Sequence, residues 1–433
     1  MFSQFSQFSL SLPSLSDIFT GPPEGAIDLE PVEIHDVETE QRKPGRALKH
    51  LLKLNHANYS ILYNDLRFHN HMPHFLSTGY LLGGDADHLN RLYEVEAKEL
   101  EPWVDSPGEI SLDDWRDHLG KKEYQRAFVD FFEDELVHHN YDWKKVVENY
   151  LYSGKHPLVN CLVSGRKSIP TQTHHFISKG NKKNPVGHPL IHLGYAVEMS
   201  SREVAIESLA MAATSYNSLH KYLDDPSYHS VTATYTSPSP LEILQKIRTD
   251  KRFDNLFQHP GADNLDTLFE HHEAELLEHW RAWSITPDPK KQFEAAQEAA
   301  AAIFVASDTQ MHDFFLLHLL TTSHAVRILL PFVPQKYHLS LLRQWWLITV
   351  AVYVAQLRPK IDPDRITEYD VKGRGWEWVD GQALHGRGAE SVHFIKGVRA
   401  LKEAGRTWGD EGGYYVKAAV KLVDEFKGFG GFE

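Results

Sequence analysis

Residues 187–198 read Gly-His-Pro-Leu-Ile-His-Leu-Gly-Tyr-Ala-Val-Glu, an apolar stretch that carries two histidines four positions apart. Pro189 is typical of the first turn of a helix, where the N–H that proline lacks is not needed. We therefore expect His188 at the start of a helix and His192 one turn further along the same face. Two imidazoles in this arrangement predict either a shared metal ion or one helix cap and one buried core histidine.

Histidines are unusually frequent along the rest of the chain, with 27 of them against 45 lysines and arginines. His318 follows a Phe-Phe pair and lies between two leucines, where a charged imidazolium would be costly and a neutral, metal-ligating imidazole would not. Taken singly, each such residue is more typical of a core histidine, but several on converging helices are typical of an internal metal site. The histidines in apolar surroundings are His56, His71, His74, His188, His192, His318 and His393.

Composition limits the fold and the partners. Signals for β-strands are scarce, so the 433 residues predict an all-α fold. An excess of 59 acidic over 45 basic residues argues against nucleic acid as a partner and favours a small molecule. Cys161 is the only cysteine of the sequence, which excludes a thiolate metal cluster and fits a reducing, cytoplasmic location. No stretch approaches the roughly 18 apolar residues of a membrane span, so no membrane association is expected.

The pattern along the chain predicts one large domain behind a lead-in. Residues 1–45 are rich in Ser, Pro and acidic side chains and are expected to be flexible. Residues 46–433 show helical periodicity and are expected to form a single helical domain with an internal metal and substrate pocket. Within it, residues 153–187 predict a long loop that covers the pocket. Pro73 predicts a turn between His71 and His74 rather than a continuous helix.

Several cofactor and nucleophile motifs are missing from the sequence. It has no Gly-x-Gly-x-x-Gly after a strand, no P-loop and no Gly-x-Ser-x-Gly. A tightly bound flavin or a Rossmann-bound nicotinamide is therefore not expected. Histidine nitrogen and carboxylate oxygen remain the available ligands for a transition metal.

Five blocks of the sequence resemble the fungal questin oxidase-like family. They are Asn-His-x-x-Tyr at 55–59, Phe-His-Asn-His-x-x-His at 68–74, the stretch 187–198, Asp-Phe-Phe-x-x-His at 313–318 and His-x-x-Lys-x-x-Arg-Ala-Leu at 393–401. The resemblance spans about residues 46–405. It implies an oxidoreductase of secondary metabolism, an oxygenase that opens the quinone ring of an anthraquinone-type polyketide to a benzophenone-type product.

The resemblance also implies which residues act. Four of five histidines would bind a non-haem Fe(II) that brings O2 to the ring. Because neutral histidines leave the charge of Fe(II) uncompensated, we also expect an anionic oxygen donor, from a carbamylated Lys396 or from Glu198. His71, His74 and Tyr59 would contact the substrate and take part in catalysis. The five candidate ligand histidines are His56, His188, His192, His318 and His393.

Three alternatives remain open at this level. A flavin-independent, NADPH-assisted Baeyer-Villiger-type oxidase would need no metal, although NADPH could also serve an iron enzyme as an external reductant. A zinc-dependent hydrolase would use the same histidines with an open water site and no O2. A non-enzymatic carrier of aromatic polyketides would use the histidines only for structure. The bound metal and the need for O2 separate these alternatives, whereas the shape of an aromatic pocket does not.

Overall fold

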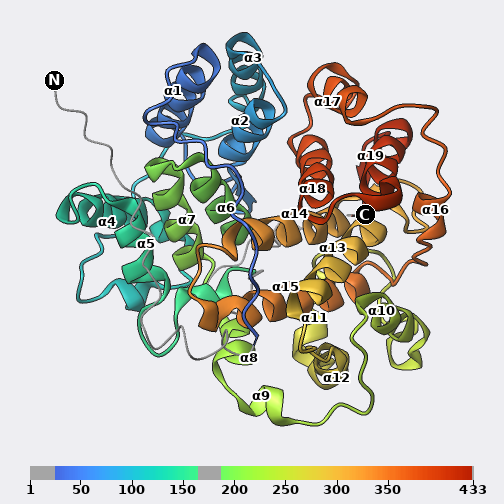
Figure 1. Cartoon of the computed structure of the whole chain (residues 1–433). Helices are drawn as coiled ribbons and strands as arrows, with labels where there is room; N and C mark the ends of the chain where they lie inside the picture. Colours follow the sequence, from blue (N-terminus) through green and yellow to red (C-terminus); the bar gives the residue numbers. More distant parts are fainter. Residues whose placement is uncertain (1–24, 164–186, 432–433) are drawn as a thin grey trace, which may run out of the picture.

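The computed structural model describes residues 25–163 and 187–431. In this part of the chain helices dominate, which confirms the all-α prediction. Figure 1 shows the helices of the first half on one side of the molecule and those of the second half on the other. The helices before residue 235 are α1 (Lys43–Asn58), α2 (Met72–Leu81), α3 (Ala86–Glu96), α4 (Gln125–His138), α5 (Trp143–Leu151), α6 (His188–Met199), α7 (Arg202–Thr214), α8 (Lys221–Asp224) and α9 (Ser227–Ser230).

The second half carries the longest helices. They are α10 (Pro240–Thr249), α11 (Asn264–His271), α12 (Glu273–Ala282), α13 (Pro289–Val305), α14 (Phe314–Leu329), α15 (His338–Ala355), α16 (Asp364–Thr367), α17 (Trp376–His385), α18 (Val392–Trp408) and α19 (Tyr414–Glu425). Two pairs of very short strands accompany them in the described residues. β1 (Leu62–Tyr63) pairs antiparallel with β2 (Phe68–His69), and β3 (His312–Asp313) pairs in parallel with β4 (Phe429–Gly430). None of the described helices is both long and apolar enough to span a bilayer.

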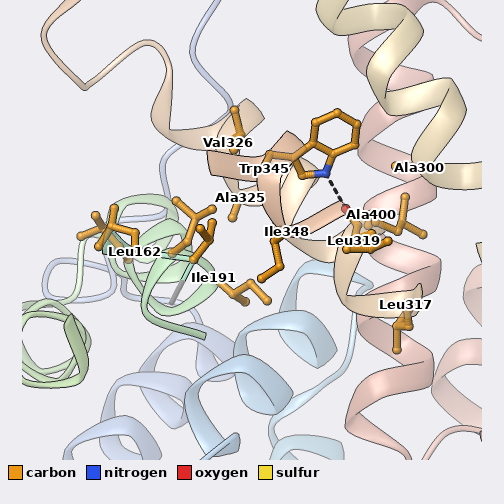
Figure 2. Packing of buried hydrophobic residues seen from close by; sticks show 14 of the residues in the cluster. Leu162, Ile191, Ala300, Leu317, Leu319, Ala325, Val326, Trp345, Ile348 and Ala400 are labelled. Carbon is orange, nitrogen blue, oxygen red and sulfur yellow. Dashed lines mark hydrogen bonds between the residues drawn. The ribbon is translucent and has the colours of Figure 1, made fainter. Parts of the chain in front are cut away.

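Helix α14 is the buried centre of the fold. Every residue from Phe315 to Leu329 is buried, and the helix packs against α6, α13, α15 and α18 (Figure 1). Trp345 of α15 packs into this core and donates its indole N–H to the carbonyl of Leu319 at 2.9 Å (Figure 2). A helix that is apolar on all sides needs neighbours on all sides, which is why α14 lies in the middle. This position lets α14 contribute side chains to an internal site.

Residues 25–42 are extended but packed against the helices. The backbone N–H groups of His35 and Val37 donate to carbonyls at the end of α6 over 2.8 and 3.2 Å. The flexible lead-in expected for residues 1–45 therefore does not describe this stretch, because its apolar side chains cover the core. Residues 1–24 lie outside the described residues, as do residues 164–186 of the expected loop. The buried side chains of the packed stretch include Ile27, Leu29, Val32 and Val37.

Two helices begin at a histidine that is closely followed by proline. His188 is the first residue of α6, as the sequence predicts, and Pro189 lies in its first turn. His71 is the N-cap of α2, and Pro73 lies in the first turn of that helix. The predicted turn between His71 and His74 is therefore wrong. Proline is tolerated in the first turn because the N–H it lacks would have no partner within the helix.

Candidate metal centre and active site

A cavity of about 290 Å³ lies where the starts of several helices meet. Aromatic side chains such as Tyr63, Phe68 and Phe314 form part of its wall, and five histidines form another part. A second cavity of the same volume, between α8, α11 and α15, has no histidine in its wall in the described part of the chain. Its size and apolar walls resemble the first, so the histidines rather than the volume mark the first cavity as the candidate site.

Four of the five histidines converge on one another, and we call them the histidine cluster: His71, His188, His318 and His393. One ligand nitrogen from each lies within 4.8 Å of the other three. Successive ring centroids around the cluster are 4.9, 5.0, 5.3 and 4.7 Å apart. The sequence placed three of these residues among the ligands and His71 among the catalytic residues. The structure brings all four together, each from a different helix.

Helix starts position the cluster. His71 caps α2, His188 opens α6, and His393 is the second residue of α18. Gly187 leads into α6 with φ of +69°, and a side chain at this position would collide with Thr322. Glycine is thus required immediately before His188. The N–H groups at helix starts carry partial positive charge, so the cavity favours anionic groups of a ligand.

Three of the four cluster histidines, His71, His188 and His318, are held neutral. Burial lowers the pKa of His71 and His188 well below the ordinary value, and nearby Lys396 and other histidines lower it further. Burial lowers the pKa of His318 to about 3. Desolvation penalises the imidazolium and leaves the neutral imidazole, which has a lone pair for a metal ion.

His318 has the hydrogen-bonding pattern of a metal ligand. Its Nδ1–H donates to the carbonyl of Phe314 at 2.7 Å, which fixes the tautomer. Its Nε2 is buried without a hydrogen-bond partner among the described residues. A ligating histidine commonly donates one ring nitrogen to a carbonyl and offers the other to the metal. His71 Nε2 and His188 Nε2 lie 2.9 Å apart, close enough to bind one ion together after a small adjustment.

Lys396 adds a buried amine beside the cluster. Its side chain is 1% exposed, and its Nζ has no hydrogen-bond partner among the described residues. Burial lowers the pKa of Lys396 to about 7, against an opposing effect of Glu96. Burial also raises the pKa of Glu96, which lines the same cavity, to about 7. Lys396 is therefore not the salt-bridged ammonium that would exclude a carbamate.

The other two predicted ligands, His56 and His192, lie outside the cluster and meet at a buried carboxylate. Glu207 of α7 binds His192 Nε2 through Oε2 and His56 Nδ1 through Oε1, each at 2.9 Å. His192 Nδ1 is bound by His74 Nε2 at 3.0 Å. His56 Nε2 lies 3.0 Å from Glu133 Oε1. Both ring nitrogens of both histidines are thus occupied by hydrogen bonds.

Three further residues predicted for the site, Glu198, Tyr59 and His74, are not members of the histidine cluster. The Glu198 carboxylate is buried and forms an ion pair with Arg399, so its charge is already compensated. Tyr59 follows the end of α1, where it pairs with Pro102 and its ring lies 6.4 Å from that of Tyr93. The ring of His74 packs edge-on against His71, with centroids 5.3 Å apart. Of these three residues, His74 alone directly adjoins the cluster.

The buried pair of His56 and Glu207 predicts a pH-dependent stability. Burial opposes the charged form of His56, but hydrogen bonds to Glu133 and Glu207 raise its pKa to about 10 from 6.5. The contribution of His56 is therefore complete below pH 6.5 and is lost as the pH rises through about 10. We expect His56→Gln to lower the unfolding free energy by about 3 kcal/mol at pH 6 and by much less at pH 10.

Thermal unfolding of both proteins across this pH range tests the expectation. The difference in Tm between wild type and His56→Gln should shrink steadily as the pH rises. Burial opposes ionisation of Glu207 as well, but hydrogen bonds from His192 and His56 lower its pKa to about 2, so acid should matter only far below neutrality. A difference in Tm that stays constant between pH 6 and pH 10 would contradict the charged pair.

Sequence reasoning missed Glu207 and Glu96. Glu207 lies in an otherwise apolar segment of α7, Val-Ala-Ile-Glu-Ser-Leu-Ala-Met, and a single carboxylate in such a segment is a signal that could have been used. Glu96 ends α3 among other acidic residues, and the sequence carries no mark that separates it from its neighbours. Its effect on Lys396 depends on the packing of α3 near the distant helix α18.

The fold and this site define a helical protein with a buried, four-histidine centre in an aromatic cavity. Residues 68–401 match the profile of the questin oxidase-like family, and the chain belongs to this family. The chain is 23% identical to a questin oxidase of Aspergillus terreus over 412 residues, which are 87% of either chain. It is 22% identical to the Baeyer-Villiger oxidase ptaJ of Pestalotiopsis fici over 372 residues, 82% of this chain and 80% of that protein.

A third relative is the oxidoreductase AflY of Aspergillus parasiticus. It is 26% identical over 395 residues, which are 85% of this chain and 74% of that protein. The names of these relatives place the chain in a family of oxidoreductases.

Proposed function

We propose that this chain is an oxygenase that opens the quinone-bearing ring of an anthraquinone-type polyketide with O2, and that the histidine cluster binds one Fe(II). The convergence of four imidazoles on one side of an aromatic cavity carries this proposal. The names of the relatives, a questin oxidase and several Baeyer-Villiger oxidases, support the reaction class and the substrate class.

The four cluster histidines would hold the metal. Imidazole nitrogen suits iron, zinc, copper and nickel, and four neutral ligands leave the charge of a divalent ion uncompensated. When bound, Fe(II) supplies the electrons that make O2 reactive toward the ring. A carbamate on Lys396 remains our prediction for the anionic ligand, because the buried amine has no partner and is neutral in part at pH 7. Glu96 in the cavity wall is the second candidate for this charge.

The cavity fits a flat, hydroxylated ring system. Tyr63, Phe68 and Phe314 offer aromatic surface on which a planar quinone can stack. The helix starts at the cluster and the guanidinium of Arg67 in the wall stabilise a phenolate oxygen. Ionisation of the phenol raises the electron density of the ring, so these groups favour the state that reacts with an oxidant.

A second candidate is the NADPH-assisted Baeyer-Villiger-type oxidase. The names of several relatives favour it. This reaction places one oxygen atom of O2 in the product and reduces the other to water at the expense of NADPH. The cluster would then orient the quinone carbonyl rather than bind a metal.

Isotope labelling separates these candidates. Purified protein, loaded anaerobically with Fe(II), is mixed with danthron, a dihydroxyanthraquinone, and labelled O2. We expect ring-opened product with two labelled oxygen atoms, formed without NADPH when danthron is first reduced to its hydroquinone, whose two electrons balance the uptake of O2. One labelled atom and a strict need for NADPH would support the Baeyer-Villiger alternative, and no O2 uptake with either reductant would remove both. A bound zinc ion with hydrolytic turnover would support the hydrolase.

A further inference from the structure

A second group of metal-ligating side chains converges outside the histidine cluster. It consists of His156, His220 and Asp224, which we call the His-Asp triad. One ligand atom from each lies within 4.8 Å of the other two. The imidazole rings of His156 and His220 have their centroids 5.0 Å apart. Two histidines and one carboxylate are a common set of ligands for zinc and other divalent transition metals.

The two histidines of the triad meet at a single carboxylate oxygen. Asp224 Oδ2 lies 2.9 Å from His156 Nδ1 and 2.8 Å from His220 Nδ1. The ligand atoms of a tetrahedral zinc ion are roughly 3.3 Å from one another, because each bond to the metal is about 2.0–2.2 Å long. An opening of about 0.5 Å between these atoms would therefore admit the ion.

The ligand side chains are oriented by partners behind them. Asn160 Nδ2 donates to Asp224 Oδ1 at 2.6 Å, and Ser340 Oγ of α15 donates to Asn160 Oδ1 at 2.5 Å. These bonds hold the carboxylate with Oδ2 toward the two histidines. The ring of His220 stacks on that of Tyr216, with centroids 4.9 Å apart. Such outer partners fix the direction of a ligand before the metal binds.

The triad combines a buried carboxylate with access from solvent. The side chain of Asp224 is 5% exposed, whereas those of His220 and His156 are 21% and 47% exposed. A metal ion can therefore reach the three atoms from the surface. Histidine binds metals in its neutral form, so the carboxylate gives the triad one negative charge that partly compensates a divalent ion. Three protein ligands leave a fourth position for water.

The same residue types meet elsewhere in the chain without this convergence. His138 Nδ1 lies 3.0 Å from Glu135 Oε1, and His139 Nε2 lies 3.8 Å from Glu135 Oε2. The two histidines thus approach different oxygens. His139 Nε2 also lies 3.0 Å from Asn149 Nδ2, which occupies its lone pair. A carboxylate between two histidines is therefore not enough, and the shared oxygen distinguishes the triad.

The triad connects two segments that are distant in the sequence. His156 lies shortly before the 3-10 helix η3 (Leu158–Cys161), and His220 ends the 3-10 helix η4 (Ser218–His220), directly before α8. His156 and Asp224 are 68 positions apart. Residues of η4 and α8 also line the second cavity. An ion in the triad would join the segments beside this wall, and a link that closes a long loop stabilises the folded chain.

We propose that the His-Asp triad is a zinc site separate from the histidine cluster. His156 Nδ1, His220 Nδ1 and Asp224 Oδ2 bind one Zn(II), and water completes the coordination. Both imidazoles then carry their proton on Nε2, so bonds to the metal replace the two Nδ1–H hydrogen bonds to the carboxylate. The ion holds the residues before η3 against α8 and stabilises the fold beside the second cavity.

Titration of metal-free, full-length His188→Ala protein with Zn(II) tests the site in a chain whose histidine cluster lacks one ligand. A zinc-sensitive competitor dye reports stoichiometry and affinity. We expect His188→Ala to bind one more zinc per chain than the double variant His188→Ala/His156→Ala, with a Kd below about 1 µM. Zinc should raise the Tm of His188→Ala by at least ~2 °C more than that of the double variant. Asp224→Asn should cause the same loss as His156→Ala.

His138→Ala in the same background is the matched control, because it removes an exposed histidine that also faces a carboxylate. It should change neither the number of bound zinc ions nor the rise in Tm. Circular dichroism checks that each variant folds, and wild type with His156→Ala alone gives the same comparison if His188→Ala does not. Equal zinc binding with and without His156, or equal losses in His156→Ala and His138→Ala, overturns the zinc site.

Discussion

His318→Ala is expected to abolish ring opening, with a loss in kcat/KM well above the ~10–100-fold that follows removal of a residue behind a metal ligand. The reason is the open Nε2 of His318, which faces the cluster while Nδ1 is fixed on the Phe314 carbonyl. Its removal takes one of four ligands and leaves a hole in the cavity wall. Initial rates of ring-opened product formation from reduced danthron and O2 measure the effect.

The control for this variant is His324→Gln on the same helix. His324 is buried as well, but its Nε2 binds Arg399 at 3.0 Å, away from the cluster. We expect His324→Gln to keep its iron and to change the rate far less than His318→Ala does. Equal losses in the two variants would mean that burial in α14, rather than the cluster, determines activity.

Lys396→Met is expected to abolish activity and at the same time to stabilise the metal-free protein. A buried amine without a partner costs free energy that an apolar side chain of similar length does not, so a gain of about 1–4 kcal/mol is expected. Because the folded pKa of Lys396 is lowered to about 7 from 10.5, its cost is greatest below pH 7 and disappears as the pH rises to 10.5. The stabilisation should therefore be larger at pH 6 than at pH 9.

Two measurements check this prediction. Thermal unfolding of apo wild type and apo Lys396→Met at both pH values gives the stability difference. Carbon-13 NMR in labelled bicarbonate shows a carbamate signal in wild type that the variant lacks. A fully active Lys396→Met protein would exclude the carbamate. Glu96 would then be the candidate for the anionic ligand.

The fold class and part of the site were predictable from the sequence for local reasons. Helical periodicity and the proline after His188 predict helix starts, and those are set by neighbouring residues. The apolar flanks of His318 likewise predict a neutral, buried imidazole, and the structure gives it a pKa of about 3. A helix start and the burial of a single histidine can both be predicted without knowing which distant residues they contact.

The partition of the histidines between the cluster and the hydrogen-bonded network around Glu207 depends on contacts between helices. His188 and His192 share one helix and nearly one face, yet His188 meets His71 while His192 meets Glu207. Nothing local separates them, because the difference arises from which residues of α2 and α7 lie opposite each histidine. From the sequence, His71 was assigned to catalysis rather than to the ligands because its contact with His188 also depends on how the helices pack.

Metal content of three purified proteins tests the central claim most directly: wild type, His188→Ala and His192→Gln. Elemental analysis after reconstitution with Fe(II) should give close to one iron per chain in wild type, almost none in His188→Ala and near-wild-type iron in His192→Gln. The two residues lie one helical turn apart, so non-specific damage to α6 would affect both variants alike. Wild type without stoichiometric iron, or iron lost from His192→Gln and kept in His188→Ala, would contradict an iron site built from His71, His188, His318 and His393.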